Sequence, residues 1–178
     1  MKRDEDERFR LFVTEHWKSL VQTAYLLTRD RGLAEDLVQS ALEKTHRRWG
    51  RIVRKDAPEV YVRRAMINTA ISWRRRRRWA EVPLLARDET PVPDRYGQVE
   101  SRQALLDALR KLSPKTQAIL VLRYFEDMSE ADIARVLNCS TGSVKSQASR
   151  GLTRLRAHLE PKETASTDIA TILQGDPA

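Results

Sequence analysis

Hydrophobic residues recur at three- and four-residue steps along most of this chain, which is the period of amphipathic α-helices. In the first half, the pattern predicts three helices, over residues 6–27, 31–49 and 59–79. Asp30 can cap the second of these helices, and Pro58 stands where a first-turn proline would open the third. Gly50 follows the second helix, and a basic, irregular loop is expected over 51–57.

The second half returns to the helical period after a stretch of different composition. Residues 80–100 contain three prolines, one glycine and five acids against two arginines, which predicts an extended acidic linker. An amphipathic helix is expected over 99–112, and Ser113-Pro114 is a cap and first-turn proline for the next helix, through Tyr124. The predicted fold is all-α, with two small helical domains over residues 6–79 and 101–159. The linker over 80–100 joins them, and a frayed tail is expected over 160–178.

The stretch Ser129–Leu159 has the pattern of a helix-turn-helix. Ser129 with Asp132 resembles a capping box in front of the first short helix. Such a motif needs a small residue at the crossing, a turn residue that tolerates positive φ and an apolar anchor, here Ala134, Asn138 and Val144. Cys139 falls in the turn, where we expect a small buried filler.

The second helix of this motif is basic and free of acids, which suits the major groove of DNA. Its exposed face is expected to offer hydroxyl and cationic side chains to bases and phosphates: Thr141, Ser143, Lys145, Ser146, Ser149 and Arg150. The alternative is a helical hairpin whose basic face is simply solvated.

Positive charge supports a polyanionic partner. The net charge is +8 and the isoelectric point about 10.0. Residues 61–79 contain seven arginines and no acid, five of them consecutive, and adjacent arginines repel one another unless an anion lies between them. Asn68 on this segment can bond a base edge, and Trp73 can either stack on a base or pack in the core. The same run also fits a localisation signal or a membrane-binding patch.

Composition argues against several other classes. One cysteine excludes an internal disulfide, and three scattered histidines predict neither a metal site nor a cofactor. The sequence shows no clustered nucleophile and base, so an enzyme is not expected. The charged N-terminus has no secretory h-region, and no apolar run approaches the ~18 residues of a membrane span, so a cytoplasmic location without membrane insertion is expected.

Three segments together resemble the extracytoplasmic-function (ECF) group of bacterial RNA polymerase sigma factors. Their sequences are most similar to an actinobacterial SigE-like subgroup. They are AEDLVQSAL at 34–42, YVRRAMINTAISWRRRRR at 61–78, and LSPKTQAILVLRYFEDMSEADIARVLNCSTGSVKSQASRG at 112–151. The resemblance implies a non-enzymatic subunit that binds core polymerase, recognises the −35 and −10 promoter elements and promotes DNA melting.

The resemblance also assigns roles to residues. AEDLVQ matches the helix that docks on the polymerase β′ clamp: Asp36, Leu37, Val38, Gln39 and Glu43. The segment 50–58 matches a loop that captures a flipped −10 base. The −10 contacts would be Arg63, Arg64, Asn68, Trp73, Arg74, Arg75 and Arg76. The second domain would read double-stranded −35 DNA and meet the β flap, and an anti-sigma factor is a further partner of such proteins.

Several positions depart from the family pattern. Ser72 replaces a common Asp, Gln147 and Ala148 replace an Arg-Leu pair, and Gly151 replaces Ala. A glycine inside a helix costs about 1 kcal/mol relative to alanine. Two rival functions remain at this point: a stand-alone helix-turn-helix transcriptional regulator, and a membrane-surface or nucleoid-coating protein that binds any polyanion through its arginine run.

Overall fold

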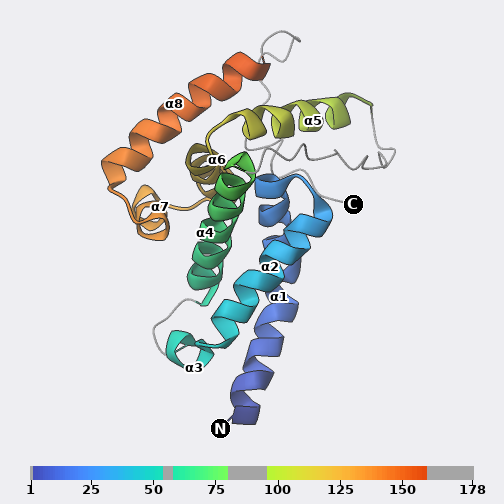
Figure 1. Cartoon of the computed structure of the whole chain (residues 1–178), viewed down its shortest axis with the longest axis vertical. Coiled ribbons are helices and arrows are strands. Elements are labelled where there is room, and N and C mark those ends of the chain that lie inside the picture. Colours follow the sequence, from blue (N-terminus) through green and yellow to red (C-terminus); the bar gives the residue numbers. More distant parts are fainter. Residues whose placement is uncertain (1, 54–57, 80–95, 160–178) are drawn as a thin grey trace. The chain divides into compact units, whose positions relative to one another are not determined.

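The computed structural model describes residues 2–53, 58–79 and 96–159, and every regular element in these residues is helical (Figure 1). The chain divides into two compact units, Met1–Arg77 and Arg78–Ala178. These observations confirm the predicted all-α class with two helical regions.

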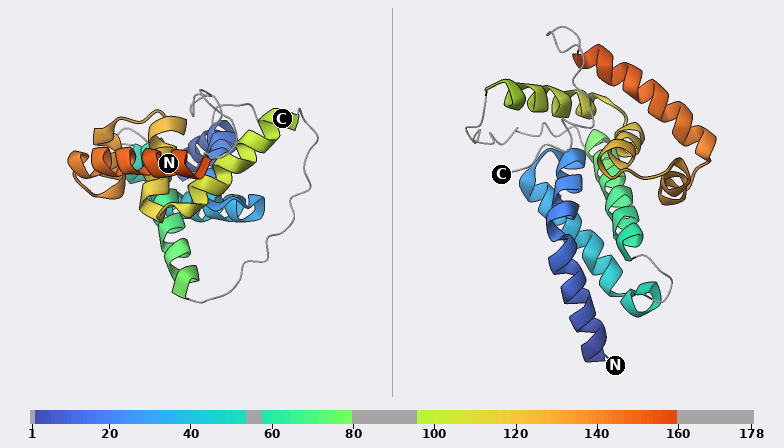
Figure 2. Two further views of the ribbon diagram at one scale, coloured as in Figure 1. Left: turned by 90° about the horizontal axis from the view of Figure 1, so that it is seen from above. Right: turned by 180° about the vertical axis from the view of Figure 1, so that it is seen from behind.

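The first unit is a small bundle. It contains α1 (Lys2–Thr28), α2 (Arg31–His46), the short α3 (Trp49–Ile52) and α4 (Pro58–Trp79). Figure 2 shows α1, α2 and α4 side by side, with α3 at one end. Because the end of α2 contacts the start of α1 and also the start of α4, α2 runs antiparallel to both: Asp6 contacts His46, and Arg48 contacts Tyr61.

Apolar side chains from these three long helices form the core of the first unit. Their shared property is nearly complete burial: Leu20, Ala24, Ala34, Leu37, Val38, Ala41, Val62, Met66 and Ile67 are each 0–1% exposed. The core therefore fixes which faces of α2 and α4 remain available to partners.

The helix ends of the first unit follow local signals only in part. Asp30 Oδ1 accepts a hydrogen bond from the Leu33 amide at 2.8 Å, as predicted for the α2 cap. The prediction that the second helix reaches Trp49 is wrong, because α2 ends at His46 and Trp49 opens α3, where it packs on Phe9 and Phe12 at ring distances of 5.0 and 5.2 Å. Part of the expected irregular loop is therefore helical, and residues 54–57 lie outside the described residues.

The second unit contains α5 (Tyr96–Lys111), α6 (Pro114–Leu120), a π-helical turn (Val121–Phe125), α7 (Glu130–Leu137) and α8 (Thr141–Leu159). The predicted linker ends too late, since α5 already begins within it; the rest of the linker and the predicted tail lie outside the described residues. The helix expected through Tyr124 instead becomes a π-turn after α6.

The helix-turn-helix has the predicted local geometry. Ser129 accepts from the Asp132 amide at the start of α7, and Asn138 at its end is left-handed with φ 50°. Ser140 accepts from the Ser143 amide at 3.1 Å and so caps α8, a role that the sequence did not suggest to us. Cys139 is half-buried rather than the buried filler that we expected.

Gly151 allows two helices of the second unit to approach closely. It is buried on α8, and a Cβ at this position would lie 2.6 Å from Thr116 Cγ2 and 3.3 Å from Leu120 Cδ1, both on α6. The Thr116 side chain is held by a 2.7 Å contact with the Ser113 hydroxyl, so its methyl group cannot move away freely. The helix-propensity cost of this glycine is therefore offset by tight packing.

We expect Gly151→Ala to lower the stability of the second unit by about 1–2 kcal/mol, because overpacking outweighs the gain in helix propensity. Hydrogen exchange of α6 and α8 amides measures this unit separately. Thr116→Ser removes the obstructing methyl group and keeps the hydroxyl, so the double variant should exchange more slowly than Gly151→Ala alone. Additive losses in the double variant would show that this contact is not the cause.

Candidate functional site

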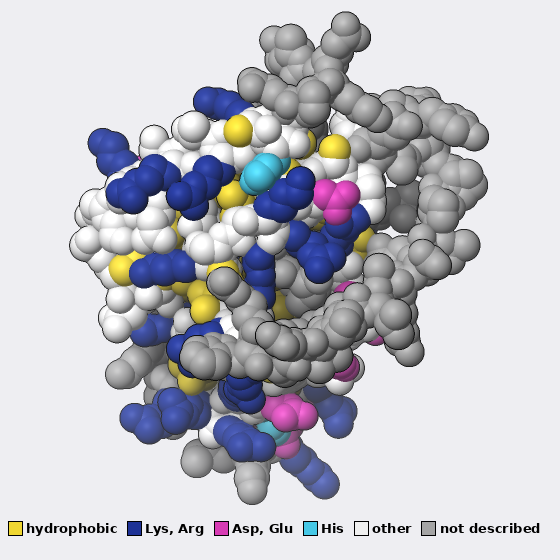
Figure 3. Space-filling model, turned by 45° about the horizontal axis from the view of Figure 1, so that its top comes forward, with side chains coloured by type: hydrophobic (Ala, Val, Ile, Leu, Met, Phe, Trp, Pro, Cys, Tyr) yellow, Lys and Arg dark blue, Asp and Glu magenta, His cyan; other side chains and the backbone are white. Residues whose placement is uncertain are grey.

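The exposed face of α8 carries the predicted DNA-contacting residues. Thr141, Lys145, Ser149 and Arg150 are exposed, and Ser143 and Ser146 are half-buried. The opposite face packs into the unit through Val144, Gly151 and Leu155. In Figure 3, Lys and Arg side chains spread over the part of the molecule that α8 crosses. The helix thus presents hydroxyls and cations outward from a rigid apolar support.

Hydroxyl groups along α8 differ in how they are used. The Ser146 hydroxyl donates to the Ser143 carbonyl, and the Thr153 hydroxyl donates to the Ser149 carbonyl, each at 3.2 Å. The Ser143 hydroxyl instead accepts a hydrogen bond from Gln147 Nε2 at 2.8 Å. The Ser143 hydroxyl is therefore bonded to a side chain, whereas the Ser146 and Thr153 hydroxyls are bonded to the backbone.

The predicted −10 residues on α4 do not share one face. Arg64, Asn68, Arg75 and Arg76 are exposed, whereas Trp73 and Arg74 are half-buried. Residues 64, 68 and 75 follow one another at helical spacing and so lie along one outer face. Arg63 points elsewhere: its side chain is only 15% exposed and its guanidinium lies 2.8 Å from Glu59 Oε2.

Glu59 joins the start of α4 to α1. Its second carboxylate oxygen lies 3.1 Å from His16 Nε2, and the His16 ring contacts Phe12 at 4.5 Å. Arg63 is thus part of a bridge between helices, so its main role in the structure is to position α4.

A surface cavity of about 450 Å³ lies between α2 and α4. It brings together three of the predicted −10 residues, Asn68, Trp73 and Arg76, with five other side chains: Ser40, Lys44, Ala65, Thr69 and Ser72. The lining includes one indole ring, one carboxamide and two cations, and it includes no carboxylate. Such a lining suits an electron-rich planar group that carries a nearby phosphate.

Lys44 was missed from the sequence. Its Nζ donates to Thr69 Oγ1 at 2.9 Å, and Thr69 in turn donates to the Ala65 carbonyl at 2.7 Å. The only signal in the sequence is that Lys44 lies one turn after Ser40, at the border of the apolar face of α2. Its position over the cavity depends on the packing of α2 against α4.

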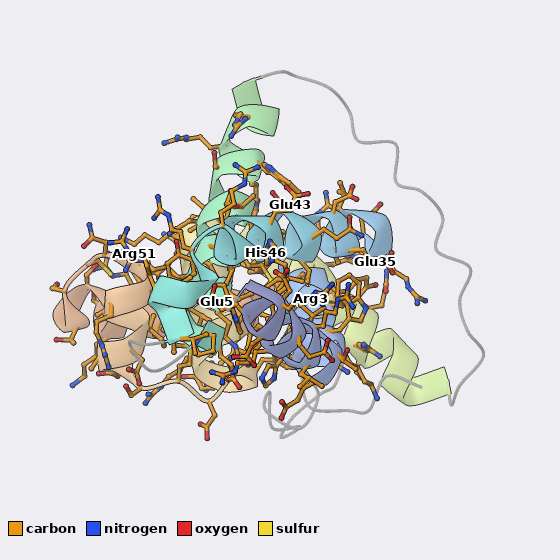
Figure 4. The ribbon with its side chains drawn as sticks, turned by 90° about the horizontal axis from the view of Figure 1, so that it is seen from below. Arg3, Glu5, Glu35, Glu43, His46 and Arg51 are labelled. Atoms are coloured by element: carbon orange, nitrogen blue, oxygen red, sulfur yellow. The ribbon has the colours of Figure 1, made fainter. Side chains whose placement is uncertain are left out.

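The candidate polymerase-binding residues on α2 divide by burial. Asp36, Gln39 and Glu43 are exposed and lie along one face at helical spacing. Figure 4 shows Glu43 on the side of α2 that faces away from the start of α1. Leu37 and Val38 are 0% exposed, so their side chains belong to the core. The prediction that these two side chains contact the polymerase is therefore wrong.

Only part of the candidate base-capturing segment 50–58 is described. Gly50 and Ile52 lie in α3, where a Cβ on Gly50 would meet the Glu5 carboxylate of α1 at 2.8 Å. Figure 4 shows Glu5 and His46 at this end of the unit. The first turns of α1 thus support the start of this segment, a contact that the sequence pattern did not predict.

Two properties of the described residues bear on other functions. No helix in residues 2–53, 58–79 or 96–159 is long and apolar enough to cross a membrane. In the same part of the chain, no group of three or more His, Cys, Asp or Glu side chains is arranged to hold a metal ion.

Comparison with known families covers both units. Residues 12–80 match the family model for sigma-70 region 2, and residues 102–155 match that for sigma-70 region 4. The RNA polymerase sigma-E factor of Streptomyces coelicolor is 39% identical over 155 residues, which are 87% of this chain and 88% of that protein. The ECF sigma factor SigM of Mycobacterium tuberculosis is 33% identical over 150 residues, which are 84% of this chain and 74% of that protein.

A solved structure with a similar fold is the sigma factor RpoE of Bartonella quintana in complex with the anti-sigma factor NepR. The TM-score is 0.72 at 24% identity, with 88% of this chain and 99% of that chain covered. At this identity the likeness concerns the fold, while the matched region models and the Streptomyces and Mycobacterium relatives carry the family. The chain therefore belongs to the ECF group of the sigma-70 family, the promoter-recognising sigma factors of RNA polymerase.

Proposed function

We propose that the first unit reads and melts the −10 element along the outer face of α4 and the adjoining cavity. The observation that carries this proposal is the meeting of Asn68, Trp73 and Arg76 with Lys44 in one acid-free cavity. An unpaired base can stack on the indole and bond the carboxamide, while the two cations hold the flanking phosphates. These contacts offset the few kcal/mol that unpairing and flipping a base requires.

In this proposal, exposed Arg64 and Arg75 hold the strand as it passes along α4, outside the cavity. Each exposed arginine that neutralises a phosphate releases counterions, which makes binding dependent on salt. The half-buried Arg74 and the Glu59-paired Arg63 contribute less to the strand and more to the position of α4.

The second unit reads the −35 element through α8, as a helix-turn-helix inserted in the major groove. Thr141, Ser143, Lys145, Ser146, Ser149 and Arg150 supply its contacts, with Lys145 and Arg150 able to reach phosphates or guanine. A residue reading one base discriminates by about 1–3 kcal/mol, so a few of these side chains are enough for promoter choice.

Core polymerase binds the exposed face of α2, with Asp36, Gln39 and Glu43 facing the β′ clamp, while the second unit meets the β flap. Catalysis belongs to the polymerase, so this chain needs no catalytic group or cofactor of its own. An anti-sigma factor is the third partner that we propose, by analogy with the complex of the Bartonella protein. It would prevent activity by covering the α2 face or the α8 face.

The direct test mixes the full chain with core polymerase and measures run-off transcripts from a panel of promoter fragments. We expect promoter-dependent transcripts and comigration of the chain with the polymerase. A stand-alone regulator would bind duplex DNA without polymerase and give no transcript, and a general polyanion binder would show steep salt dependence without sequence preference. Either result contradicts the proposal.

The role of α4 is tested by Arg75→Gln, with Arg10→Gln on α1 as a control that removes the same charge from another exposed position. Binding of the holoenzyme to a single-stranded −10 oligonucleotide is measured by fluorescence anisotropy at several salt concentrations. We expect Arg75→Gln to reduce the salt slope by about 0.7, the value for one phosphate contact on a single strand. Equal slopes for the two variants would remove Arg75 from the strand path.

The role of α2 is tested by the double variant Asp36→Asn/Glu43→Gln, compared with Glu7→Gln on the exposed side of α1. We expect the affinity for core polymerase to fall by about tenfold, or ~1.4 kcal/mol, because both carboxylates lie on the proposed contact face. Competition with a labelled wild-type chain measures this change. Wild-type affinity in the double variant would place the polymerase contact on another face.

A further inference from the structure

The hydrogen bond between Gln147 and Ser143 changes what the recognition helix can offer to DNA. Gln147 Nε2 lies 2.8 Å from Ser143 Oγ, one turn earlier on α8. A serine hydroxyl has one hydrogen to donate and two lone pairs that accept. Because the amide occupies a lone pair, the Ser143 hydrogen is directed away from Gln147.

The Ser143 hydrogen has no acceptor within the part of the chain that the structure describes. Its neighbours Ser146 and Thr153 donate their hydroxyl hydrogens to backbone carbonyls of α8, which is the usual arrangement inside a helix. Ser143 therefore keeps a donor for a partner, while these two hydroxyls do not. The difference between them is the side chain at position 147.

The surroundings of this pair suit an electron-rich partner. Gln147, Arg150 and Arg154 follow Ser143 at steps of four, seven and eleven residues, so they lie on the same flank of α8. Both arginines are exposed, and α8 contains no acid along its length. The flank thus combines one oriented hydroxyl donor with two cations.

From these contacts we infer that Gln147 is a positioning residue of the recognition helix: it holds the Ser143 hydroxyl as a donor to an acceptor atom of the −35 DNA. That acceptor is a phosphate oxygen or the acceptor edge of a base, namely purine N7, guanine O6 or thymine O4. The inference rests on the proposed −35 role of α8. It also gives a function to one of the positions where this chain departs from the family pattern.

The test uses the reconstituted holoenzyme and a promoter library in which the −35 bases are randomised. Four variants are compared: Gln147→Met, which keeps the length but removes the amide; Ser143→Ala; the double variant; and Ser143→Thr, which keeps a hydroxyl. Gln103→Met, at an exposed position of α5, makes the same chemical change elsewhere in the second unit. Hydrogen exchange of α8 amides accompanies each measurement.

We expect Gln147→Met and Ser143→Ala to reduce initiation by a similar factor, roughly 3- to 10-fold if the acceptor is a base and more than about 10-fold if it is an anionic phosphate. The double variant should lose no more than the stronger single variant, since both act through one hydroxyl. Ser143→Thr should recover most of the activity, and Gln103→Met should behave as the wild type. A loss confined to one −35 position identifies a base acceptor, and an equal loss at all sequences identifies a phosphate.

Three outcomes would overturn the inference. One is wild-type initiation by Gln147→Met, another is losses that add in the double variant, and the third is faster α8 exchange in Gln147→Met with no effect of Ser143→Ala. A wild-type holoenzyme that initiates regardless of the −35 sequence would instead overturn the proposed role of α8. The failure of the inference and the failure of the proposed function are therefore distinguishable.

Discussion

Helix α4 has to be buried on one side and strongly cationic on the other, and the first unit depends on keeping these sides apart. Complete burial of Val62, Met66 and Ile67 contributes about 1.5–3 kcal/mol for each side chain. Repulsion between like charges one turn apart costs only a few tenths of a kcal/mol per pair. Apolar packing therefore outweighs the repulsion, and the helix can carry its clustered arginines without unfolding.

Polar contacts then set the rotation and position of α4 on this apolar base. His16 and Arg63 both contact Glu59 in the first turn of α4, and Lys44 donates a hydrogen bond to Thr69 near the middle of α4. These contacts come from α1, α2 and α4 itself, so each helix contributes to the placement of Asn68 and Trp73. The cavity is in this sense a product of the whole bundle rather than of one motif.

Local chemistry explains what could be predicted from the sequence. Asp30, Ser113, Ser129 and Asn138 act on amides or backbone angles within a few residues, so a short window is enough to predict their roles. The arginine-rich helix and the α8 face also follow from helical periodicity. Periodicity did not predict which side chains of these two helices are exposed, half-buried or paired.

What could not be predicted depends on contacts between distant segments. Trp49 opens a separate helix because it packs on Phe9 and Phe12 of α1, about forty residues earlier. Leu37 and Val38 lie within a motif that suggested a surface role, yet tertiary packing buries them completely. The π-turn after α6 likewise has no signal in its sequence that we could identify.

The close approach at Gly151 has a consequence for exchanging recognition helices between relatives. A donor helix with alanine at this position would bring a Cβ against the Thr116 methyl group of α6, whatever DNA contacts it carried on its outer face. Positions 116 and 151 therefore form one steric unit although 35 residues separate them. A chimera designed to change promoter choice has to take both positions from the same parent.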